Sequence, residues 1–272
     1  MSKVILITGA SRGFGKIWAN AFLKRGDKVV AAVRDINSVK DLVSQYGNAV
    51  LPVKLDVNDR AAAFSAIKKA KETFGRIDVL INNAGYGQMG AIEEISEQQA
   101  RDQFETNVFG TLWTTQAVLP VMREQGSGHI INISSVLGLV GLPILAWYNA
   151  SKFAVEGLSE SLAGEVAGFG IKVSIIEPNG FSTEFGGPSA KFGDPISAYG
   201  AVKEAVFANF TEDFYGQPTA TIDAVLQLVD NTNPPLRLLL GKKGLPWVKQ
   251  VYDSRLAEFE TYKEVSAKAH GH

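Results

Sequence analysis

The segment VILITGASRGFG, residues 4–15, decides the fold because a strand-length apolar run leads through three glycines into a helical pattern. Its first half predicts a buried strand, and the spacing that follows predicts a helix over about residues 16–25. Gly9 permits a tight turn, Gly13 lets backbone N–H groups approach a phosphate group, and Gly15 lets the helix pack close to the strand. Because the positive end of a helix dipole favours anions, we expect a phosphate-binding turn here.

The rest of the chain repeats this alternation of strand and helix. Apolar, β-rich runs recur along it at 3–8, 28–33, 49–55, 77–81, 129–134, 171–176 and 236–240. Between them lie segments with helical spacing, such as 59–74 and 98–124. Strands that are almost continuously apolar are typical of a parallel sheet covered by helices on both faces. The pattern predicts an α/β fold with a doubly wound, Rossmann-like parallel sheet of about seven strands, in a single domain over residues 1–272.

Composition excludes several classes of function. With 46% hydrophobic residues, 20% charged residues and a net charge of -1, the chain lacks the electrostatic pattern of a nucleic-acid or membrane-surface protein. It has no cysteine, which rules out disulfides, thiolate metal sites and cysteine nucleophiles. His129 is expected to be a strand-entry residue without chemistry, and His270 and His272 lie in the tail, so we expect no metal site. The first residues lack a signal-peptide pattern, which makes a cytoplasmic location the expectation.

Polar residues and glycines follow each predicted strand, at the edge where such sheets bind ligands. The first turn has the spacing TGxxxGxG over residues 8–15, which differs from both GxGxxG and GxxxxGK. Further motifs follow in order: Asp56-Val57, Asn82-Asn83-Ala84-Gly85, Asn107, Ser135, Tyr148-xxx-Lys152, and Pro178 through Thr183. With these motifs the chain resembles the classical short-chain dehydrogenase/reductase family over at least residues 3–183.

Tyr148 and Lys152 are the candidate acid–base pair. They lie four residues apart in a segment of helical periodicity and therefore share a face. A phenol, with an ordinary pKa of about 10, is a poor acid–base group at neutral pH, and a nearby ammonium is expected to lower that pKa. The resemblance implies that Lys152 also hydrogen-bonds the nicotinamide ribose.

The resemblance also implies roles for Ser135 and Asn107. Ser135 would donate a hydrogen bond to a substrate oxygen, whereas its neighbour Ser134 points to the opposite face of the strand. Asn107 lies inside the long predicted helix, where asparagine is unfavourable, and is implied to bend that helix and hold a water that links Lys152 to solvent. A serine hydrolase is excluded because no GxSxG motif surrounds Ser135 and no histidine is placed to assist it. The expected catalytic residues are Asn107, Ser135, Tyr148 and Lys152.

Cofactor choice is determined after the second strand, where an acidic residue would bind an adenosine ribose 2′-OH. Val33 occupies that position, Arg34 follows it, and Arg12 lies in the glycine turn. Two guanidiniums in this region are suited to clamp a 2′-phosphate, which predicts NADP(H). The alternative is that Arg34 is a solvated residue paired with Asp35.

Other cofactor contacts follow from the resemblance, in which Asp56 binds the adenine amine, Val57 packs beside the ring and Asn83 lies along the ribose. As an alternative, Asp56 would cap the helix over 59–74, a role for which Asn58 is the better candidate. The expected cofactor-binding residues are Gly9, Ser11, Arg12, Gly13, Phe14, Gly15, Arg34, Asp56, Val57, Asn83, Ala84, Gly85, Tyr148, Lys152, Pro178, Phe181 and Thr183.

The sequence departs from the family pattern at Asn179, where the family usually has glycine. Asparagine tolerates left-handed backbone better than most residues, so it is expected either to keep this turn or to alter the pocket. Residues 184–215, which include Gly187 and Pro188, are rich in glycine, proline and aromatic residues and suggest an apolar lid. A surface loop packed by its own aromatic residues is the alternative. The expected substrate contacts are Leu137, Phe185 and Phe192.

An amphipathic helical extension over 245–268, which includes Trp247, is expected either to cover the substrate mouth or to pack at a subunit interface. The sequence as a whole predicts NADPH-dependent reduction of a ketone or aldehyde to an alcohol, a reversible hydride transfer. Alternatives are a 3-ketoacyl thioester or hydroxysteroid reductase, a sugar-nucleotide epimerase or dehydratase, and a non-enzymatic NADP-sensing protein. The expected partners are a small carbonyl or alcohol and further copies of the chain in a homodimer or homotetramer, with no nucleic acid and no membrane.

Overall fold

The computed structural model describes residues 2–186 and 190–271 and contains a seven-stranded parallel sheet. Its strands, in the order in which they lie across the sheet, are β3 (Val50–Lys54), β2 (Lys28–Val33), β1 (Val4–Thr8), β4 (Val79–Asn82), β6 (Gly128–Ile133), β7 (Ile171–Pro178) and β9 (Arg237–Leu240). Each apolar run forms one strand, with ends within about two residues of the prediction. The predicted fold class is therefore confirmed. Met1, residues 187–189 of the expected lid, and His272 lie outside the described residues.

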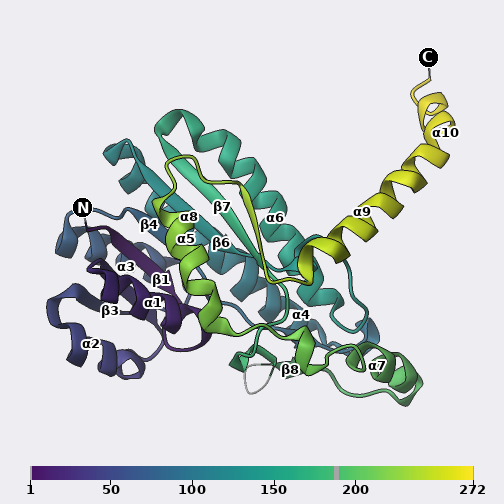
Figure 1. Ribbon diagram of the computed structural model, residues 1–272, viewed down its shortest axis with the longest axis horizontal. Coiled ribbons are helices and arrows are strands. Elements are labelled where there is room, and N and C mark those ends of the chain that lie inside the picture. Colours follow the sequence, from purple (N-terminus) through teal and green to yellow (C-terminus); the bar gives the residue numbers. More distant parts are fainter. Residues whose placement is uncertain (1, 187–189, 272) are drawn as a thin grey trace.

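Helices cover both faces of this sheet (Figure 1). One face packs against α3 (Arg60–Phe74), α5 (Gly110–Gln125) and α6 (Ala146–Val166), and the other against α1 (Gly13–Arg25), α2 (Lys40–Tyr46) and α8 (Ile222–Asp230). The order of the strands reverses between β1 and β4, where a crevice opens at the carboxyl ends in folds of this kind.

The continuous apolar runs are explained by these two layers. Leu6 faces the core on the side of α3 and α5, whereas Ile5 and Ile7 face the core beneath α1, and all three are fully buried. Successive strand residues point to opposite faces, so a strand buried on both faces needs an apolar residue at every position. Burying each such side chain contributes roughly 1.5–3 kcal/mol, which makes the central strands the most firmly held part of the scaffold.

The long predicted helix over 98–124 is interrupted. Helix α4 (Glu97–Phe104) leads into a π-helical turn, Glu105–Phe109, before α5 begins. Asn107 lies in that turn. Such turns widen the helix locally and are frequent at functional sites, which accounts for an asparagine inside a helical segment.

The residue that caps α3 was predicted wrongly. Asp59 is the N-cap, and its side chain accepts a hydrogen bond from the Ala62 backbone N–H at 3.0 Å. Asp56 instead accepts a hydrogen bond from the Asn58 backbone N–H at 3.1 Å, so neither of the two proposed residues caps the helix. The extended backbone of Asp59 places its carboxylate over the first turn, as an N-cap requires.

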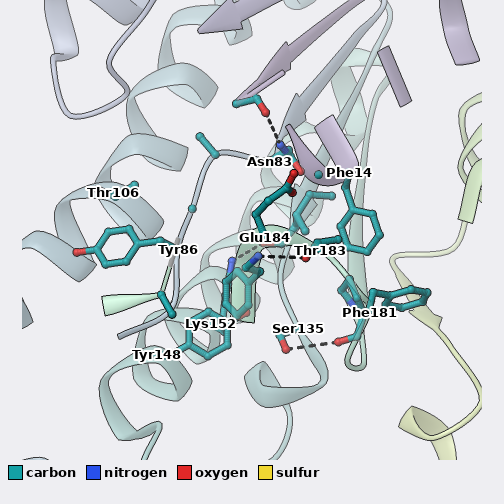
Figure 2. A pocket seen from close by; sticks show the side chains of 18 of the residues that line it. Phe14, Asn83, Tyr86, Thr106, Ser135, Tyr148, Lys152, Phe181, Thr183 and Glu184 are labelled. Carbon is teal, nitrogen blue, oxygen red and sulfur yellow. Dashed lines mark hydrogen bonds between the residues drawn. The ribbon is translucent and has the colours of Figure 1, made fainter. Parts of the chain in front are cut away.

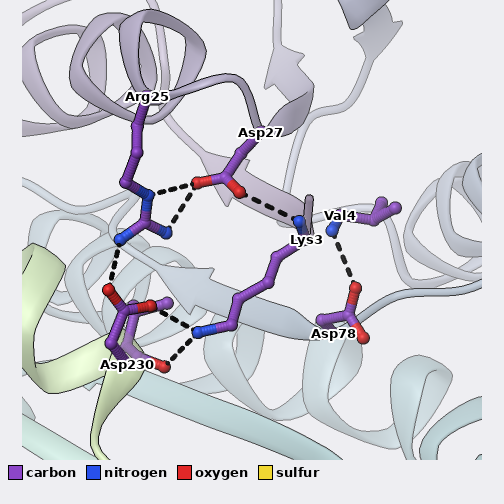
Figure 3. Close-up of polar contacts among 7 residues, drawn as sticks. Lys3, Val4, Arg25, Asp27, Asp78 and Asp230 are labelled. Carbon is purple, nitrogen blue, oxygen red and sulfur yellow. Dashed lines mark hydrogen bonds and ion pairs between the residues drawn. The ribbon is translucent and has the colours of Figure 1, made fainter. Parts of the chain in front are cut away.

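Three aspartates tie down the amino end of the sheet, away from the carboxyl ends (Figure 3). Asp27 accepts hydrogen bonds from the Lys3 backbone N–H at 2.9 Å and from Arg25 Nε at 2.7 Å. Asp230 pairs with Lys3 Nζ at 2.5 Å and Arg25 Nη1 at 2.8 Å. Asp78 accepts a hydrogen bond from the Val4 backbone N–H at 2.8 Å. This network joins β1 to α1 and α8 and has a structural role.

The two segments beyond β7 lie at the carboxyl end of the sheet. In the expected lid, β8 (Lys191–Phe192) pairs in parallel with β5 (Gln88–Met89), and α7 (Gly200–Phe207) follows. The C-terminal extension forms α9 (Gly244–Thr261) and α10 (Lys263–Lys268), whose far end projects away from the body (Figure 1). Within the described ranges, no helix has the length and apolarity needed to cross a bilayer, and no group of acidic and histidine side chains is arranged to hold a metal ion.

Candidate active site

A cavity of about 650 Å³ lies at the carboxyl ends of the strands. The glycine turn lines one end of it, and Ser135, Tyr148 and Lys152 line the other (Figure 2). Every residue predicted to bind the cofactor lines this cavity except Gly15, which lies beneath the turn. The structure therefore brings together in one pocket predicted cofactor-binding side chains that are up to 172 positions apart in the sequence, from Ser11 to Thr183.

The glycine turn requires its glycines. Gly9 and Gly13 have φ of 68° and 52°, in the left-handed region that other residues seldom adopt. A methyl group on Gly15 would lie 2.4 Å from the carbonyl oxygen of Gly9, so only glycine allows the helix to approach the strand this closely. Helix α1 begins at Gly13, earlier than predicted, and has no acidic residue in its first turn. Its free N-terminal N–H groups therefore form an anion-binding end at the cavity wall.

Asn83 and Thr8 brace this turn against the loop after β4. Asn83 Nδ2 donates to the carbonyl oxygens of Thr8 and Gly9 at 2.9 and 3.2 Å. The hydroxyl of Thr8 accepts from the backbone N–H groups of Asn83 and Ala84, both at 3.0 Å. The Asn83 side chain is thus occupied in shaping the turn, in addition to lining the cavity.

Arg12 and Arg34 face the cavity without a partner among the residues that the structure describes. The alternative in which Asp35 pairs with Arg34 is wrong. Asp35 Oδ1 accepts hydrogen bonds from the backbone N–H and Nδ2 of Asn37 at 3.0 and 3.1 Å, so its carboxylate caps the following 3₁₀ turn. Two uncompensated guanidiniums therefore lie at the end of the cavity next to Val33, which is apolar and buried.

Tyr148 and Lys152 lie on the same face of α6, as predicted, and both are buried. Lys152 Nζ donates to the carbonyl oxygen of Ile133 at 2.7 Å and lies 5.7 Å from the centre of the Tyr148 ring. Ser135 follows β6, where its hydroxyl accepts from the Leu137 N–H at 3.1 Å and contacts the Pro178 carbonyl oxygen at 3.4 Å. Three groups able to donate a proton or a hydrogen bond therefore line the same part of the cavity (Figure 2).

Burial controls the protonation of this group. It raises the pKa of the Tyr148 phenol above its ordinary value, and a hydrogen bond with Ser135 partly offsets the rise. Burial lowers the pKa of Lys152 to about 8, against the raising effect of Glu156. The expected lowering of the Tyr148 pKa by Lys152 does not occur in this arrangement, because the ammonium is directed to the Ile133 carbonyl group. At neutral pH the pair is a neutral phenol beside an ammonium.

Asn107 is buried and uses its side chain to hold the backbone of neighbouring segments. Its Oδ1 accepts from the Tyr86 N–H at 3.1 Å, and its Nδ2 donates to the Tyr86 carbonyl oxygen and to Ser151 Oγ, each at 3.1 Å. It does not line the cavity, but only Gly85 separates it from Lys152, since a Cβ on Gly85 would lie 3.1 Å from Asn107 Oδ1 and 3.8 Å from Lys152 Nζ.

Asn179 does not adopt the left-handed backbone that was one expectation for it. Ile144 is the one residue other than glycine with positive φ in the described ranges. The Asn179 N–H donates to the Leu240 carbonyl oxygen at 2.9 Å and so continues the ladder between β7 and β9 in an extended conformation. Its side chain fills the space left by Gly241, because a Cβ there would lie 1.8 Å from Asn179 Oδ1. Asn179 also lines the cavity, which agrees with the other expectation.

Two of the three predicted substrate contacts line the cavity. Leu137 and Phe185 lie in its wall, and the ring of Phe185 lies 5.2 Å from that of Tyr148. Phe192 does not line it and is 60% exposed, whereas its neighbour Lys191 in β8 does line it, because successive strand residues point to opposite sides. The prediction for Phe192 is therefore wrong.

Sequence reasoning missed several other lining residues, including Met89, Leu142, Phe210 and Glu184. Trp247 at the start of α9 also lines the cavity, so the near end of the C-terminal extension borders the pocket. The aromatic composition of the segment over 184–215 was a signal for Phe210. Nothing in the sequence indicated Met89, which is held at the cavity by the pairing of β5 with β8.

Glu94 attaches the segment over 184–215 to the body. Its Oε1 accepts from the Ile196 N–H at 2.6 Å and from Lys203 Nζ at 2.5 Å, and its Oε2 accepts from the Ala91 N–H at 2.8 Å. The Ile196 N–H and the Lys203 ammonium hold the pKa of Glu94 down at about 2. A charged carboxylate thus fixes this segment beside the cavity.

Comparison with known proteins agrees with this geometry. The model of the short chain dehydrogenase family matches residues 3–192. The chain is 39% identical to oxidoreductase BOA17 of Botryotinia fuckeliana over 98% of both chains. A crystal structure of a short-chain dehydrogenase from Streptomyces avermitilis superposes with a TM-score of 0.91 at 39% identity over 98% of both chains.

More distant solved structures contain nicotinamide cofactors. A short-chain dehydrogenase/reductase from Burkholderia phymatum in complex with NAD superposes with a TM-score of 0.82 at 26% identity, covering 94% of this chain and 95% of that one. A short-chain dehydrogenase from Burkholderia cenocepacia in complex with NADP has a TM-score of 0.76 at 28% identity, covering 96% and 97%. With the family match over residues 3–192, these comparisons show that the chain belongs to the short-chain dehydrogenase/reductase family of oxidoreductases.

Proposed function

We propose that the protein is an NADPH-dependent reductase that converts an apolar ketone or aldehyde to an alcohol. The observation that carries the proposal is the arrangement of one cavity. Its one end has an anion-binding glycine turn and two arginines that no described residue pairs with, and its other end has Ser135, Tyr148 and Lys152.

The residues present fit a nicotinamide dinucleotide. Gly9 and Gly13 line the cavity without side chains, and the start of α1 would supply N–H donors for a diphosphate. Asp56 and Val57, which also line the cavity, would contact the adenine. Arg12 and Arg34 would hold a 2′-phosphate, and Phe181 and Thr183 would lie on the nicotinamide side. The bound reduced cofactor would supply the hydride.

The chain's own groups supply the proton. Ser135 and Tyr148 would hydrogen-bond a substrate oxygen, which polarises the carbonyl group. Because burial keeps the Tyr148 phenol protonated at neutral pH, it is in the form needed to donate its proton to the developing alkoxide. The Lys152 ammonium would then pass a proton to the Tyr148 phenolate, and solvent would return a proton to Lys152 through a water that Asn107 would hold.

The substrate is proposed to be apolar because the wall opposite Tyr148 is apolar. It is built from Leu137, Leu142, Phe185, Phe210 and Trp247. The segment over 184–215 would act as a lid that excludes water during the reaction. A 3-ketoacyl thioester and a hydroxysteroid stay alternatives within this substrate class.

The proposal is tested by following NADPH oxidation across a panel of aliphatic and aromatic ketones, a 3-ketoacyl thioester and a ketosteroid. Tyr148→Phe should keep NADPH binding, measured by fluorescence, while turnover falls by at least about a hundredfold, the usual contribution of a positioned acid. Tyr46→Phe is the matched control, because Tyr46 bonds Asn20 outside the cavity. NADPH binding with no turnover on any carbonyl would instead favour a non-enzymatic NADP-sensing protein, and retained turnover in Tyr148→Phe would refute the assignment.

A homodimer or homotetramer is part of the proposal. Leu256, Phe259, Tyr262 and Val265 at the far end of the extension are each more than 60% exposed. Residues 249–268 carry four basic and four acidic side chains, so this segment has no net charge. Its exposed apolar face is therefore suited to pack against the same face of a second chain. Light scattering should give the mass of two or four chains, reduced by Leu256→Glu, and a monomeric wild type would overturn this. The cytoplasmic location stays a prediction from the sequence.

A further inference from the structure

A buried group of charges lies behind Lys152, on the side away from the cavity. Glu156 follows Lys152 by one turn of α6, Glu177 lies near the end of β7, and Arg237 begins β9. Glu156 and Glu177 are only 5% and 1% exposed. The mechanism proposed above uses neither carboxyl group.

Arg237 alone supplies too little positive charge to pair with all the carboxyl groups around it. Arg237 Nε lies 3.2 Å from Glu156 Oε2 and 3.5 Å from Glu177 Oε1, while its Nη2 bonds the exposed Glu160 at 2.9 Å. Both oxygens of Glu177 and Oε1 of Glu156 receive no hydrogen bond from the described residues. A buried carboxylate without partners is strongly disfavoured, so one of these groups is expected to retain a proton.

A retained proton also explains why the Glu156 and Glu177 side chains can lie in contact. The carboxyl groups of Glu156 and Glu177 lie within hydrogen-bond reach of each other, and two carboxylates form such a bond only when one is protonated. Burial, together with the negative charge of Glu156, raises the pKa of Glu177 to about 8. Arg237 Nε donates a hydrogen bond to Glu156 at 3.2 Å, whereas neither oxygen of Glu177 receives one from a described residue, so the proton belongs on Glu177 and the charge on Glu156.

We propose that Glu156 and Glu177 share a single proton and that the negative charge left on Glu156 keeps Lys152 in its ammonium form. Glu156 is thus a positioning residue for Lys152, and Glu177 restricts the pair to one charge. The charged or titratable groups facing the pair are Lys152 and Glu160 on α6 and Arg237 on β9, and the Ser134 hydroxyl faces it from the end of β6. The inference rests on the proposed function only where Lys152 is assigned to catalysis.

The direction in which each substitution should shift the Lys152 pKa follows from the two influences on that pKa. Burial lowers its pKa, and the Glu156 charge raises it. Removing that charge leaves burial unopposed, so Lys152 should lose its proton at a lower pH. Replacing Glu177 has the opposite consequence, because Glu156 is then ionised without a like-charged neighbour and should hold Lys152 in the charged form at least as strongly.

The titration of Lys152 can be measured without any turnover. Competitive acetylation of the intact protein across a pH series, with Lys152 quantified by mass spectrometry, reports the pH at which its amine becomes reactive. Glu156→Gln should shift this midpoint down by about one pH unit. Glu177→Gln should leave it in place or shift it up. Glu160→Gln is the matched control, since Glu160 is on the same helix and bonds the same arginine but is exposed, and it should cause no shift.

Several results would overturn the inference: an unchanged midpoint in Glu156→Gln, a downward shift in Glu177→Gln, or an equal shift in Glu160→Gln. Glu156→Asp retains the charge and should restore the wild-type midpoint, which separates loss of charge from loss of packing. If Glu156→Gln fails to fold, the direction of the shift in Glu177→Gln decides the question, because an upward shift supports the inference and a downward shift overturns it. A protein that reduces no carbonyl compound but shows these shifts would refute the proposed function and leave this inference standing.

Discussion

Replacing Arg34 with alanine is expected to lower kcat/KM for NADPH about tenfold and to leave kcat/KM for NADH almost unchanged. Arg34 is exposed and lines the cavity without an ion pair to any residue that the structure describes, so a 2′-phosphate would be its charge partner. Hydrogen bonds to charged groups contribute about 1.5–3 kcal/mol, and solvent exposure places this contact at the lower end. About 1.4 kcal/mol corresponds to a factor of ten.

Arg12 should contribute similarly, so the double variant Arg12→Ala/Arg34→Ala is expected to lose about a hundredfold with NADPH. The wild-type KM for NADPH should rise with added KCl, because exposed charges are screened, and that dependence should weaken in the double variant. The assay is initial-rate kinetics with both cofactors at several salt concentrations.

Lys54→Ala is the control for this experiment. Lys54 ends β3, the neighbouring strand, and removing it deletes the same charge at the same edge of the sheet but outside the cavity. Equal losses with NADPH and NADH in Arg34→Ala would show that the arginine supports the turn and does not recognise a phosphate. A wild type that uses NADH as well as NADPH would refute the cofactor preference itself.

Three further variants test other parts of the site. Glu94→Gln should loosen the segment over 184–215, raise KM for the carbonyl substrate and speed proteolysis in that segment. The pKa of Glu94 in the folded protein is about 2, below its ordinary 4.5. The stabilisation by its carboxylate should therefore be complete above pH 4.5 and be lost as the pH falls toward 2. Gly15→Ala should lower both the melting temperature and NADPH affinity, since its methyl group would lie 2.4 Å from the Gly9 carbonyl oxygen, and an unchanged protein would contradict the close packing. Glu184→Gln should tighten NADPH binding a few-fold, measured by fluorescence titration, because the Glu184 carboxylate lies beside the phosphate-binding turn, 3.6 Å from the Cβ position of Gly13; weaker binding would show that it assists the cofactor instead.

The sheet could be predicted from the sequence because each strand is buried on both faces. That burial requires an apolar residue at every position, and such a run is visible without knowledge of its neighbours. The residues at strand ends were predictable for the same reason, since all carboxyl ends of a parallel sheet meet at one edge. Glycine positions such as Gly9 and Gly13 follow from local backbone conformation, which the sequence encodes directly.

The errors arose where one side chain had a choice of partners. Asp35 could pair with Arg34 or cap the turn after it, and only the backbone of that turn shows that it caps. Asp59 caps α3 in place of the two earlier candidates because of its own extended conformation. Phe192 faces away from the cavity because its neighbour Lys191 in β8 lines it, and β8 pairs with β5, a contact between segments about 100 residues apart that no local pattern indicates.

Asn179 shows how a departure from a family pattern can be absorbed by a second, distant residue. Read alone, an asparagine in place of glycine suggested that the left-handed turn was kept. In the structure its backbone is extended and pairs with Leu240, and its side chain occupies the space beside Gly241. The freedom of glycine is found at position 241 instead, where φ is 98°. Gly241 therefore leaves room for the Asn179 side chain where β7 and β9 end, and because its φ is 98°, a side chain at 241 should destabilise the protein even together with a smaller residue at 179.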